Sequence, residues 1–344
     1  MSDNILSLIY TFSKKFSDPK TKLAFEPKNQ NISAIINQGN VNIFLKVNDE
    51  NIDQYRDIVR LLKQNIESIP GVLSVNIALT SEKMTKNQGK KFSIDANNII
   101  AIASGKGGVG KSTFSVNLSV ALNSLGFKVG LLDADIYGPS VPRMMNISKK
   151  PEMNENKKLI PIENYGVKCM SIGFILNEEA PTIWRGPMVM KALEQMFNGV
   201  DWGKLDYLII DMPPGTGDAQ LTLAQSAKLS GSIVVTTPQE VALTDARKGI
   251  RMFNKVNVDI LGIVENMSYF KCNNCSQKHF IFSKDGAVKE ADRFKIPFLG
   301  NIPIDIELRK RSDDGEPCFI GNPNGELAKI YTNIAKNLNE YLLN

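Results

Sequence analysis

The run Gly105–Ser112, with the sequence GKGGVGKS, constrains this chain more than any other feature. It fits the pattern G-x-x-x-x-G-K-[ST], follows an apolar strand at Ile99–Ala103 and opens a helix at Thr113. Glycines there let backbone N–H groups turn inward around phosphate oxygens, and the helix N-terminus adds partial positive charge. Lys111 is expected to reach the β- and γ-phosphates, and the Ser112 hydroxyl to bind Mg²⁺. The nucleotide-binding residues predicted here are Gly105, Lys106, Gly107, Gly108, Val109, Gly110, Lys111, Ser112 and Thr113.

From Asn98 onward, short apolar strands alternate with helical segments. Near-continuous apolar strands separated by helices indicate a mostly parallel sheet covered by helices on both faces, an α/β fold of the P-loop NTPase kind. An amphipathic helix follows at Glu326–Leu342, with its apolar residues on one side. The strands expected are Ile99–Ala103, Lys128–Leu132, Tyr207–Ile210, Ser232–Thr236, Ile260–Val264 and Phe298–Ile302.

The first 80 residues show a separate pattern, a small α+β unit in the order αββαβ. Its later elements are strands at Ile32–Asn37 and Val41–Val47 around a turn at Gln38-Gly39-Asn40, a helix at Asp53–Ser68 and a strand at Val72–Leu79. The lysine-rich run SEKMTKNQGKK that follows has almost nothing to bury and is typical of a linker, although it could also be a solvated loop inside one larger domain. We therefore predict a small domain over residues 1–80, a linker over 81–97 and an ATPase domain over 98–344.

Carboxylates stand where two apolar strands end. Asp135 follows the strand with the sequence LLD, and Asp211 ends the strand LIID. The carboxyl ends of parallel strands face the ligand crevice, so Asp135 is expected to position the attacking water or to reach Mg²⁺ through water. Asp211 is expected to bind Mg²⁺ through its water shell, whereas Asp133 could be structural. Lys111, Asp135 and Asp211 are thus the predicted catalytic residues of a Mg²⁺-dependent nucleotide hydrolase, with Ser112, Asp135 and Asp211 as its metal ligands.

The composition excludes several other classes of protein. One histidine and four cysteines in 344 residues rule out a His-rich metal site and a disulfide scaffold, and they favour a reducing compartment. The net charge of +5 comes without a dense basic block interleaved with aromatic residues, so no nucleic-acid partner is expected. No apolar run approaches the roughly 18 residues that span a bilayer, so no membrane partner is expected. The N-terminal run places Lys14 and Lys15 after its apolar stretch, the reverse of a signal peptide, and a cytoplasmic location is expected.

Cys272 and Cys275 form a C-x-x-C motif. Such a pair can be a redox dithiol, but that use normally belongs to a thioredoxin-like unit. It can be half of a zinc site, completed by Cys169, Cys318 or His279. It can also be half of an iron–sulfur site, which requires four thiolates and could be completed by a second copy of the chain. Cys169 and Cys318 lie in apolar sequence and are expected to be core thiols, and His279 is expected at the surface.

The glycine-rich loop with Lys106 resembles the deviant Walker A loop of the SIMIBI class, the group of MinD, ParA and the nitrogenase iron protein. The resemblance implies that Lys106 reaches across a homodimer to the partner's nucleotide, which adds Lys106 to the predicted catalytic residues. An Asn at the end of a later strand, here Asn266 in GIVENM, hydrogen-bonds the adenine edge in this class, which favours ATP. No guanine-reading N-K-x-D motif appears in the sequence.

Longer motifs resemble the Mrp/NBP35-type (ApbC-type) P-loop ATPases, which are iron–sulfur cluster carrier proteins. They are GKGGVGKST, DADIYGPSVPRM, IWRGPMVMKALEQ, DYLIIDMPPGTGD, TTPQEVALTDARKG and ENMSYFKCNNC. The resemblance implies a homodimer that holds a labile [4Fe–4S] cluster on Cys272 and Cys275 of each subunit. ATP binding and hydrolysis would accompany transfer of the cluster to apo-proteins, with assembly scaffold proteins as further partners. The N-terminal segment is similar to the MIP18-type domain, but it contains no Cys. Two alternatives stay open: a MinD/ParA-like positioning ATPase, and an ATPase bridged by a Cys₄ zinc site.

Overall fold

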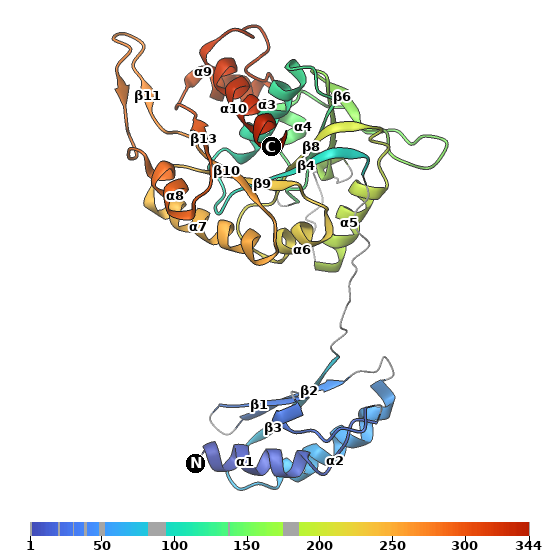
Figure 1. The fold of residues 1–344 in the computed structure, drawn as a ribbon. Coiled ribbons are helices and arrows are strands. Elements are labelled where there is room, and N and C mark those ends of the chain that lie inside the picture. The colour runs from blue at the N-terminus through green and yellow to red at the C-terminus, as the bar shows by residue number, and fades with distance from the viewer. Residues whose placement is uncertain are drawn as a thin grey trace. The chain divides into compact units, whose positions relative to one another are not determined.

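The computed structural model describes residues 2–19, 21–29, 31–37, 40–47, 52–81, 94–136, 138–174 and 186–343. Contacts within the chain divide it into two compact units, Met1–Gly89 and Lys90–Asn344 (Figure 1). Most of the predicted linker, residues 82–93, lies outside the described residues, as does the predicted turn residue pair Gln38-Gly39.

In the N-terminal unit, two helices cover one face of a three-stranded sheet (Figure 1). Strand β2 pairs with β1 antiparallel and with β3 parallel, because α2 carries the chain back from β2 to β3. The expected helix at Asp53–Ser68 differs at its start, where a 3₁₀ turn precedes the α-helix and the Tyr55 hydroxyl is held by Asp18 at 3.0 Å. The elements are α1 (Ser2–Ser13), η1 (Pro27–Asn29), β1 (Ile32–Asn37), β2 (Asn40–Val47), η2 (Ile52–Tyr55), α2 (Arg56–Glu67) and β3 (Ser74–Ser81).

An eight-stranded sheet forms the centre of the second unit, in the order β13-β10-β9-β4-β8-β5-β7-β6. Every neighbouring pair is parallel except β6 with β7. The predicted mostly parallel α/β fold is therefore confirmed. The strands are β4 (Ala96–Ala103), β5 (Val129–Asp133), β6 (Ile162–Asn164), β7 (Val167–Ser171), β8 (Leu205–Asp211), β9 (Gly231–Thr236), β10 (Ile260–Glu265) and β13 (Phe298–Asn301).

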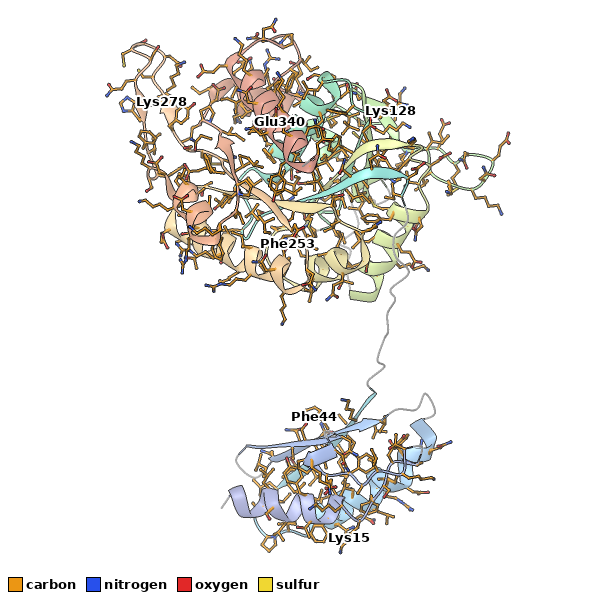
Figure 2. The ribbon with its side chains drawn as sticks, viewed as in Figure 1. Lys15, Phe44, Lys128, Phe253, Lys278 and Glu340 are labelled. Carbon is orange, nitrogen blue, oxygen red and sulfur yellow. The ribbon has the colours of Figure 1, made fainter. Side chains whose placement is uncertain are left out.

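Helices cover both faces of this sheet (Figure 1). Each face has its own apolar core. Phe253 of α7 is fully buried in one core (Figure 2), whereas Phe114 of α3 and Tyr331 of α10 meet in the other with ring centroids 6.0 Å apart. The helices are α3 (Lys111–Ser124), α4 (Val141–Met144), η3 (Ile172–Phe174), α5 (Gly186–Asn198), α6 (Asp218–Ser226), α7 (Glu240–Lys255), α8 (Gly286–Phe294), α9 (Ile306–Asp314) and α10 (Glu326–Leu343). None of the helices in the described ranges combines the length and the apolar character that a membrane span requires.

Several strands are not apparent from the sequence pattern. β7 and its antiparallel neighbour β6 extend the sheet beyond β5, and β7 contains a lysine and a cysteine among only five residues. The two-residue strands β11 (Phe270–Lys271) and β12 (Lys278–His279) form a small separate hairpin. β4 begins at Ala96 rather than Ile99, because Ala96 and Asn98 pair with the start of β8. Pairing with a neighbouring strand, rather than local apolar periodicity, defines these elements.

Candidate functional site

The glycine-rich motif occupies the turn between β4 and α3, on the central strands of the sheet. Gly108 and Gly110 have φ angles of +82° and +84°, which residues with a Cβ rarely adopt. At Gly105, a Cβ would lie 2.2 Å from the carbonyl carbon of Asp245, so the loop backbone packs directly against α7. The motif glycines are therefore required by turn geometry and by this close approach.

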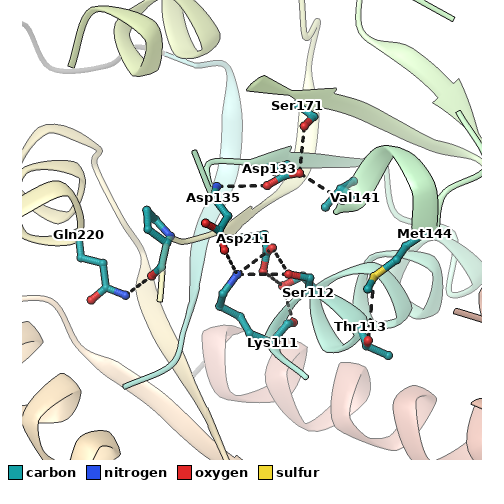
Figure 3. A network of polar contacts seen from close by, with 12 residues as sticks. Lys111, Ser112, Thr113, Asp133, Asp135, Val141, Met144, Ser171, Asp211 and Gln220 are labelled. Atoms are coloured by element: carbon teal, nitrogen blue, oxygen red, sulfur yellow. Dashed lines mark hydrogen bonds and ion pairs between the residues drawn. The ribbon is translucent and has the colours of Figure 1, made fainter. Parts of the chain in front are cut away.

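Lys111 is the first residue of α3, and its buried side chain points toward carboxylates at the ends of two strands (Figure 3). Its Nζ lies 2.9 Å from Oδ2 of Asp211, which ends β8, and 3.6 Å from Oδ2 of Asp135, which follows β5. The Ser112 hydroxyl donates to the same Asp211 oxygen at 2.6 Å. The fold thus brings together four of the predicted site residues from three separate parts of the chain.

The oxygen donors of this cluster suit a hard divalent cation. Ser112 offers a hydroxyl, and Asp135 and Asp211 offer carboxylates, which are the ligand types that Mg²⁺ prefers. A bound cation would offset the charge that Lys111 now neutralises, so the ammonium group could turn to phosphate oxygens. The residues present therefore fit a Mg²⁺–nucleotide site.

Ser115 belongs to this cluster, although it lies outside every sequence motif of the site. Its hydroxyl is buried and donates to Oδ1 of Asp211 at 2.7 Å, while Ser112 occupies Oδ2. Both oxygens of Asp211 are thereby held by serines of α3. The only signal in the sequence is the position of Ser115 one helical turn after Lys111, which places both residues on the same face of the helix.

Asp133 is fully buried and lies next to the cluster, where it anchors the loop that carries Asp135 (Figure 3). Its carboxylate accepts hydrogen bonds from the backbone N–H of Asp135 at 3.1 Å, from that of Val141 at 3.2 Å and from the hydroxyl of Ser171 at 2.9 Å. Burial raises the pKa of Asp133 to about 7, and the nearby Asp211 adds to the rise, whereas Lys111 opposes it. These contacts favour a structural role for Asp133.

Lys106 extends from the loop as an exposed side chain. Its reach into a partner's nucleotide site stays a prediction. Thr113 lies in the first turn of α3, where its Oγ1 is 4.0 Å from the Sδ atom of Met144 (Figure 3). Of the remaining loop residues, Val109 is buried and Gly107 is exposed.

Asn266 directly follows β10 and contacts the phosphate loop. Its Nδ2 donates to the backbone carbonyl of Val109 at 2.8 Å, and a Cβ at Gly110 would lie 2.1 Å from the same nitrogen. The predicted contact of Asn266 with adenine is a separate matter and stays a prediction. The contact with the loop was not foreseen, because no local pattern relates residues that lie 157 positions apart.

The loop after β8 also approaches the phosphate loop. Gly215 adopts a φ of +96°, and its N–H donates to the carbonyl of Ser104 at 3.0 Å. The side-chain amide of Gln220 donates to the carbonyl of Pro213. A loop that follows Asp211 and touches the strand end before Gly105 is well placed to respond to a bound phosphate.

The two cysteines of the C-x-x-C motif lie on the turn of the β11–β12 hairpin. The N–H of Cys272 donates to the carbonyl of Gln277, and the N–H of Ser276 donates to the carbonyl of Cys272, both at 2.9 Å. Backbone N–H groups of Cys275 and Asn274 favour the thiolate and lower the pKa of Cys272. Cys275 is exposed, so the pair combines thiolate character with access from solvent.

The other candidate ligands lie elsewhere. Cys169 and Cys318 are buried, and burial raises the pKa of both thiols, that of Cys318 to about 12. This agrees with the prediction that they are core thiols, and His279 is exposed as predicted. Across the described ranges, no three His, Cys, Asp or Glu side chains are grouped so that they could hold a metal ion. Within this part of one chain, the hairpin therefore offers two thiolates and no further ligand.

A cavity of about 610 Å³ adjoins the hairpin. Its lining includes Cys272, apolar side chains such as Ile304 and Ile306, and the N-terminus of α10 at Glu326. Lys271 bridges the hairpin to Glu326, with Nζ and Oε2 at 2.6 Å.

The second unit matches a protein family along nearly its whole length. The family described as NUBPL iron-transfer P-loop NTPase matches residues 95–339. An Arabidopsis thaliana protein named "Iron-sulfur protein required for NADH dehydrogenase, mitochondrial" is 56% identical over 241 residues, which cover 70% of this chain and 77% of that protein. An "Iron-sulfur cluster carrier protein" of Synechocystis is 41% identical over 337 residues, which cover 96% of both chains and hence both units.

Solved structures agree with the fold of the second unit. A nucleotide-binding protein from Archaeoglobus fulgidus in complex with ADP is 39% identical, with a TM-score of 0.59, over 70% of this chain and 98% of that one. The cell division ATPase MinD from Pyrococcus furiosus has a TM-score of 0.52 over 71% of this chain and 99% of that one. Its identity is only 23%, so the second likeness concerns the fold alone.

Proposed function

The chain belongs to the NUBPL iron-transfer family of P-loop NTPases, and on this basis we propose that it is an iron–sulfur cluster carrier. It binds a labile [4Fe–4S] cluster at a homodimer interface and transfers it to apo-proteins, and ATP binding and hydrolysis accompany the transfer. The observation that carries the proposal is the C-x-x-C hairpin, where the pKa of the Cys272 thiol is lowered and Cys275 is exposed. The hairpin belongs to the same unit as the candidate nucleotide site around Lys111 and Asp211.

The cysteine geometry supports the shared cluster. A [4Fe–4S] cluster requires four thiolates, and the hairpin supplies Cys272 and Cys275. A two-fold axis through a second copy of the hairpin would supply the other two. A cluster held half by each chain is released when the subunits separate, which suits cargo better than a permanent electron-transfer centre.

The nucleotide site supports hydrolysis of ATP. Lys111 and Lys106 would neutralise charge on the transferred phosphoryl group, Asp135 would orient the attacking water, and Ser112 with Asp211 would hold Mg²⁺. Bound Mg²⁺ supplies charge stabilisation to the phosphoryl oxygens. Ser115 keeps Asp211 in place, and Asp133 keeps the backbone of Asp135 in place.

The alternatives have weaker support. The likeness to MinD is at the level of fold, whereas relatives from Aquifex aeolicus and Synechocystis that are named iron–sulfur cluster carrier proteins share 52% and 41% of aligned residues with this chain. A Cys₄ zinc bridge would use the same four thiolates, and it differs from an iron–sulfur cluster in being colourless.

The Synechocystis relative matches across 96% of this chain and thus includes the N-terminal unit. This match supports a role for the N-terminal unit in the carrier. We propose that residues 1–80 are a MIP18-like domain, a comparison that rests on the αββαβ order of the unit. Apo iron–sulfur proteins and assembly scaffold proteins are the proposed partners of the chain.

Anaerobic reconstitution followed by iron counting and absorbance spectroscopy tests the proposal. We expect about four iron atoms per dimer and a brown chromophore, both lost in Cys272→Ala and retained in Cys318→Ala. Unchanged iron in the Cys272→Ala protein, or a colourless zinc protein of the same stoichiometry, would refute it.

A further inference from the structure

A single short segment joins the phosphate loop to the cysteine hairpin. It runs from Glu265, the last residue of β10, to Lys271, which directly precedes Cys272. At its start, the buried amide of Asn266 donates to the loop carbonyl of Val109 at 2.8 Å. There is no room for a Cβ between this amide and Gly110, so a shift of the loop must either displace Asn266 or break the bond.

The middle of the segment is held tightly. The Ser268 hydroxyl lies 2.7 Å from Oε1 of Glu265 and 3.1 Å from Oδ1 of Asn301. The backbone N–H of Ser268 donates to the carbonyl of Ile302 at 3.0 Å. Glu265 is itself fully buried and accepts from the N–H of Ala287 at the start of α8. Ser268 therefore keeps the segment in register with β13 and α8, so the segment moves as one piece.

One residue of the segment has an unfavourable backbone conformation. Met267 has a φ of +56°, in the left-handed region that residues with side chains seldom occupy. Such a conformation persists only where neighbouring contacts impose it, and here the contacts of Asn266 and Ser268 lie on either side. The turn at Met267 is thus maintained jointly by the phosphate loop and by β13.

The far end of the segment lies next to open space. The carbonyl of Tyr269 accepts from the N–H of Ile304 at 2.7 Å, after which the hairpin begins. Cys272 lines the cavity of about 610 Å³ between the hairpin and the start of α9, so this end has room to shift when the segment moves. A movement that starts at the phosphate loop is therefore expressed at the cysteines.

From this arrangement we propose that the segment Glu265–Lys271 couples the nucleotide site to the C-x-x-C hairpin, with Asn266 as the contact at the loop and Ser268 as the positioning residue. Nucleotide binding changes the accessibility and cluster affinity of Cys272 and Cys275. Because coupling is reciprocal, a cluster on the cysteines changes nucleotide affinity by the same factor. This inference deepens the proposed carrier function, since the cargo site is the one that is regulated.

Alkylation of the full-length protein without a cluster tests the coupling without requiring iron. The rates at Cys272 and Cys275 are measured by peptide mass spectrometry with and without a non-hydrolysable ATP analogue and Mg²⁺. We expect the analogue to change these rates by about fivefold or more in the wild type, in the usual range of coupling between sites. Ser268→Ala should reduce the ratio to about one while leaving affinity for the analogue within about twofold of the wild type.

Two further variants keep the experiment decisive. Asn301→Ala removes one of the two acceptors of Ser268 at a half-buried position and is the milder change if Ser268→Ala folds poorly. Ser232→Ala is the matched control. Ser232 is also buried, but it lies near the start of strand β9, at the end of the strand that is remote from Glu265 and Asn266. Its hydroxyl lies 3.4 Å from the backbone carbonyl oxygen of Asp259. The control should retain the wild-type ratio.

A ratio of one in the wild type, or an undiminished ratio in both Ser268→Ala and Asn301→Ala, would overturn the inference. If dimerisation alone protected Cys272 and Cys275, the ratio would stay undiminished in both variants. This outcome can be separated from that of the carrier proposal. If the protein binds iron but nucleotide does not change the alkylation rates, the chain is a carrier that this segment does not regulate. Thiol coupling without iron binding leaves a coupled site whose cargo is not a cluster.

Discussion

Replacing Lys111 with Met should destabilise the second unit as well as impair nucleotide binding. Only 6% of the Lys111 side chain is exposed, and Nζ lies 2.9 Å from the buried Asp211 and 3.6 Å from Asp135. Removing one partner of a buried ion pair costs about 3–5 kcal/mol. Ser112 and Ser115 still donate to Asp211, so we expect a loss near the lower end, about 3 kcal/mol. For a unit of about 250 residues this corresponds to a fall in Tm of roughly 6–12 °C.

Tryptophan fluorescence during urea or thermal unfolding measures this loss in the full-length chain. The N-terminal unit contains no tryptophan, and Trp202 is buried in the second unit, so the signal reports on the second unit. Lys248→Met is the matched control, because Nζ of Lys248 lies 2.8 Å from Asp245 but 60% of its side chain is exposed. An exposed pair of this kind contributes at most about 1 kcal/mol.

A double-mutant cycle identifies the cause. Lys111→Met combined with Asp211→Asn removes both charges, so the loss should fall short of the sum of the single losses by roughly 2 kcal/mol. If the double variant loses the full sum, or if Lys111→Met unfolds within about 1 kcal/mol of the wild type, the ion pair does not have the assigned role.

The deficit of Lys111→Met should also depend on pH. Lys111 lowers the pKa of Asp133, which is about 7 in the wild type, so the pKa of Asp133 rises further when the cation is removed. The pKa of Asp133 is higher in the folded state than its unfolded value of 3.8, so the folded state binds this proton more tightly. The free energy of unfolding therefore falls as pH rises from the unfolded pKa to the folded pKa, and a higher folded pKa in the variant extends this fall to higher pH. Measured with EDTA present, the deficit should therefore be larger at pH 8 than at pH 5.

Three further outcomes are expected. Iodoacetamide at pH 7 should modify Cys272 much faster than Cys169, because backbone N–H groups lower the pKa of the first thiol and burial raises that of the second; equal rates would contradict this. Lys106→Ala should reduce the rate of ATP hydrolysis by about 100-fold in a steady-state assay while ATP binding persists, and an unchanged rate would remove Lys106 from the catalytic residues. Gly105→Ala should weaken nucleotide binding in a fluorescence titration, because its Cβ would clash with the backbone of Asp245; wild-type affinity would contradict the close packing of the loop.

The sequence alone determined the parts of this protein that depend on short stretches of chain. The glycine-rich loop, the carboxylates at strand ends and the C-x-x-C pair are local patterns, and their spacing follows from strand, turn and helix geometry. The apolar strands from Ile99 to Ile302 predicted the parallel sheet for the same reason, because a buried strand needs a continuous apolar run. These patterns were sufficient for the fold class and for a list of candidate residues.

The tertiary structure decided which of these groups touch. Ser115 meets Asp211 across 96 positions, and Asn266 meets Val109 across 157, so no local periodicity relates them. Strand order places β8 and β10 on either side of the loop, and side-chain packing then selects the contacts. A segment such as β7 forms because a neighbouring strand offers hydrogen-bond partners, which its own five residues do not reveal. The sequence thus specified the chemical groups, and the packing of distant segments specified their arrangement around the nucleotide and the cysteines.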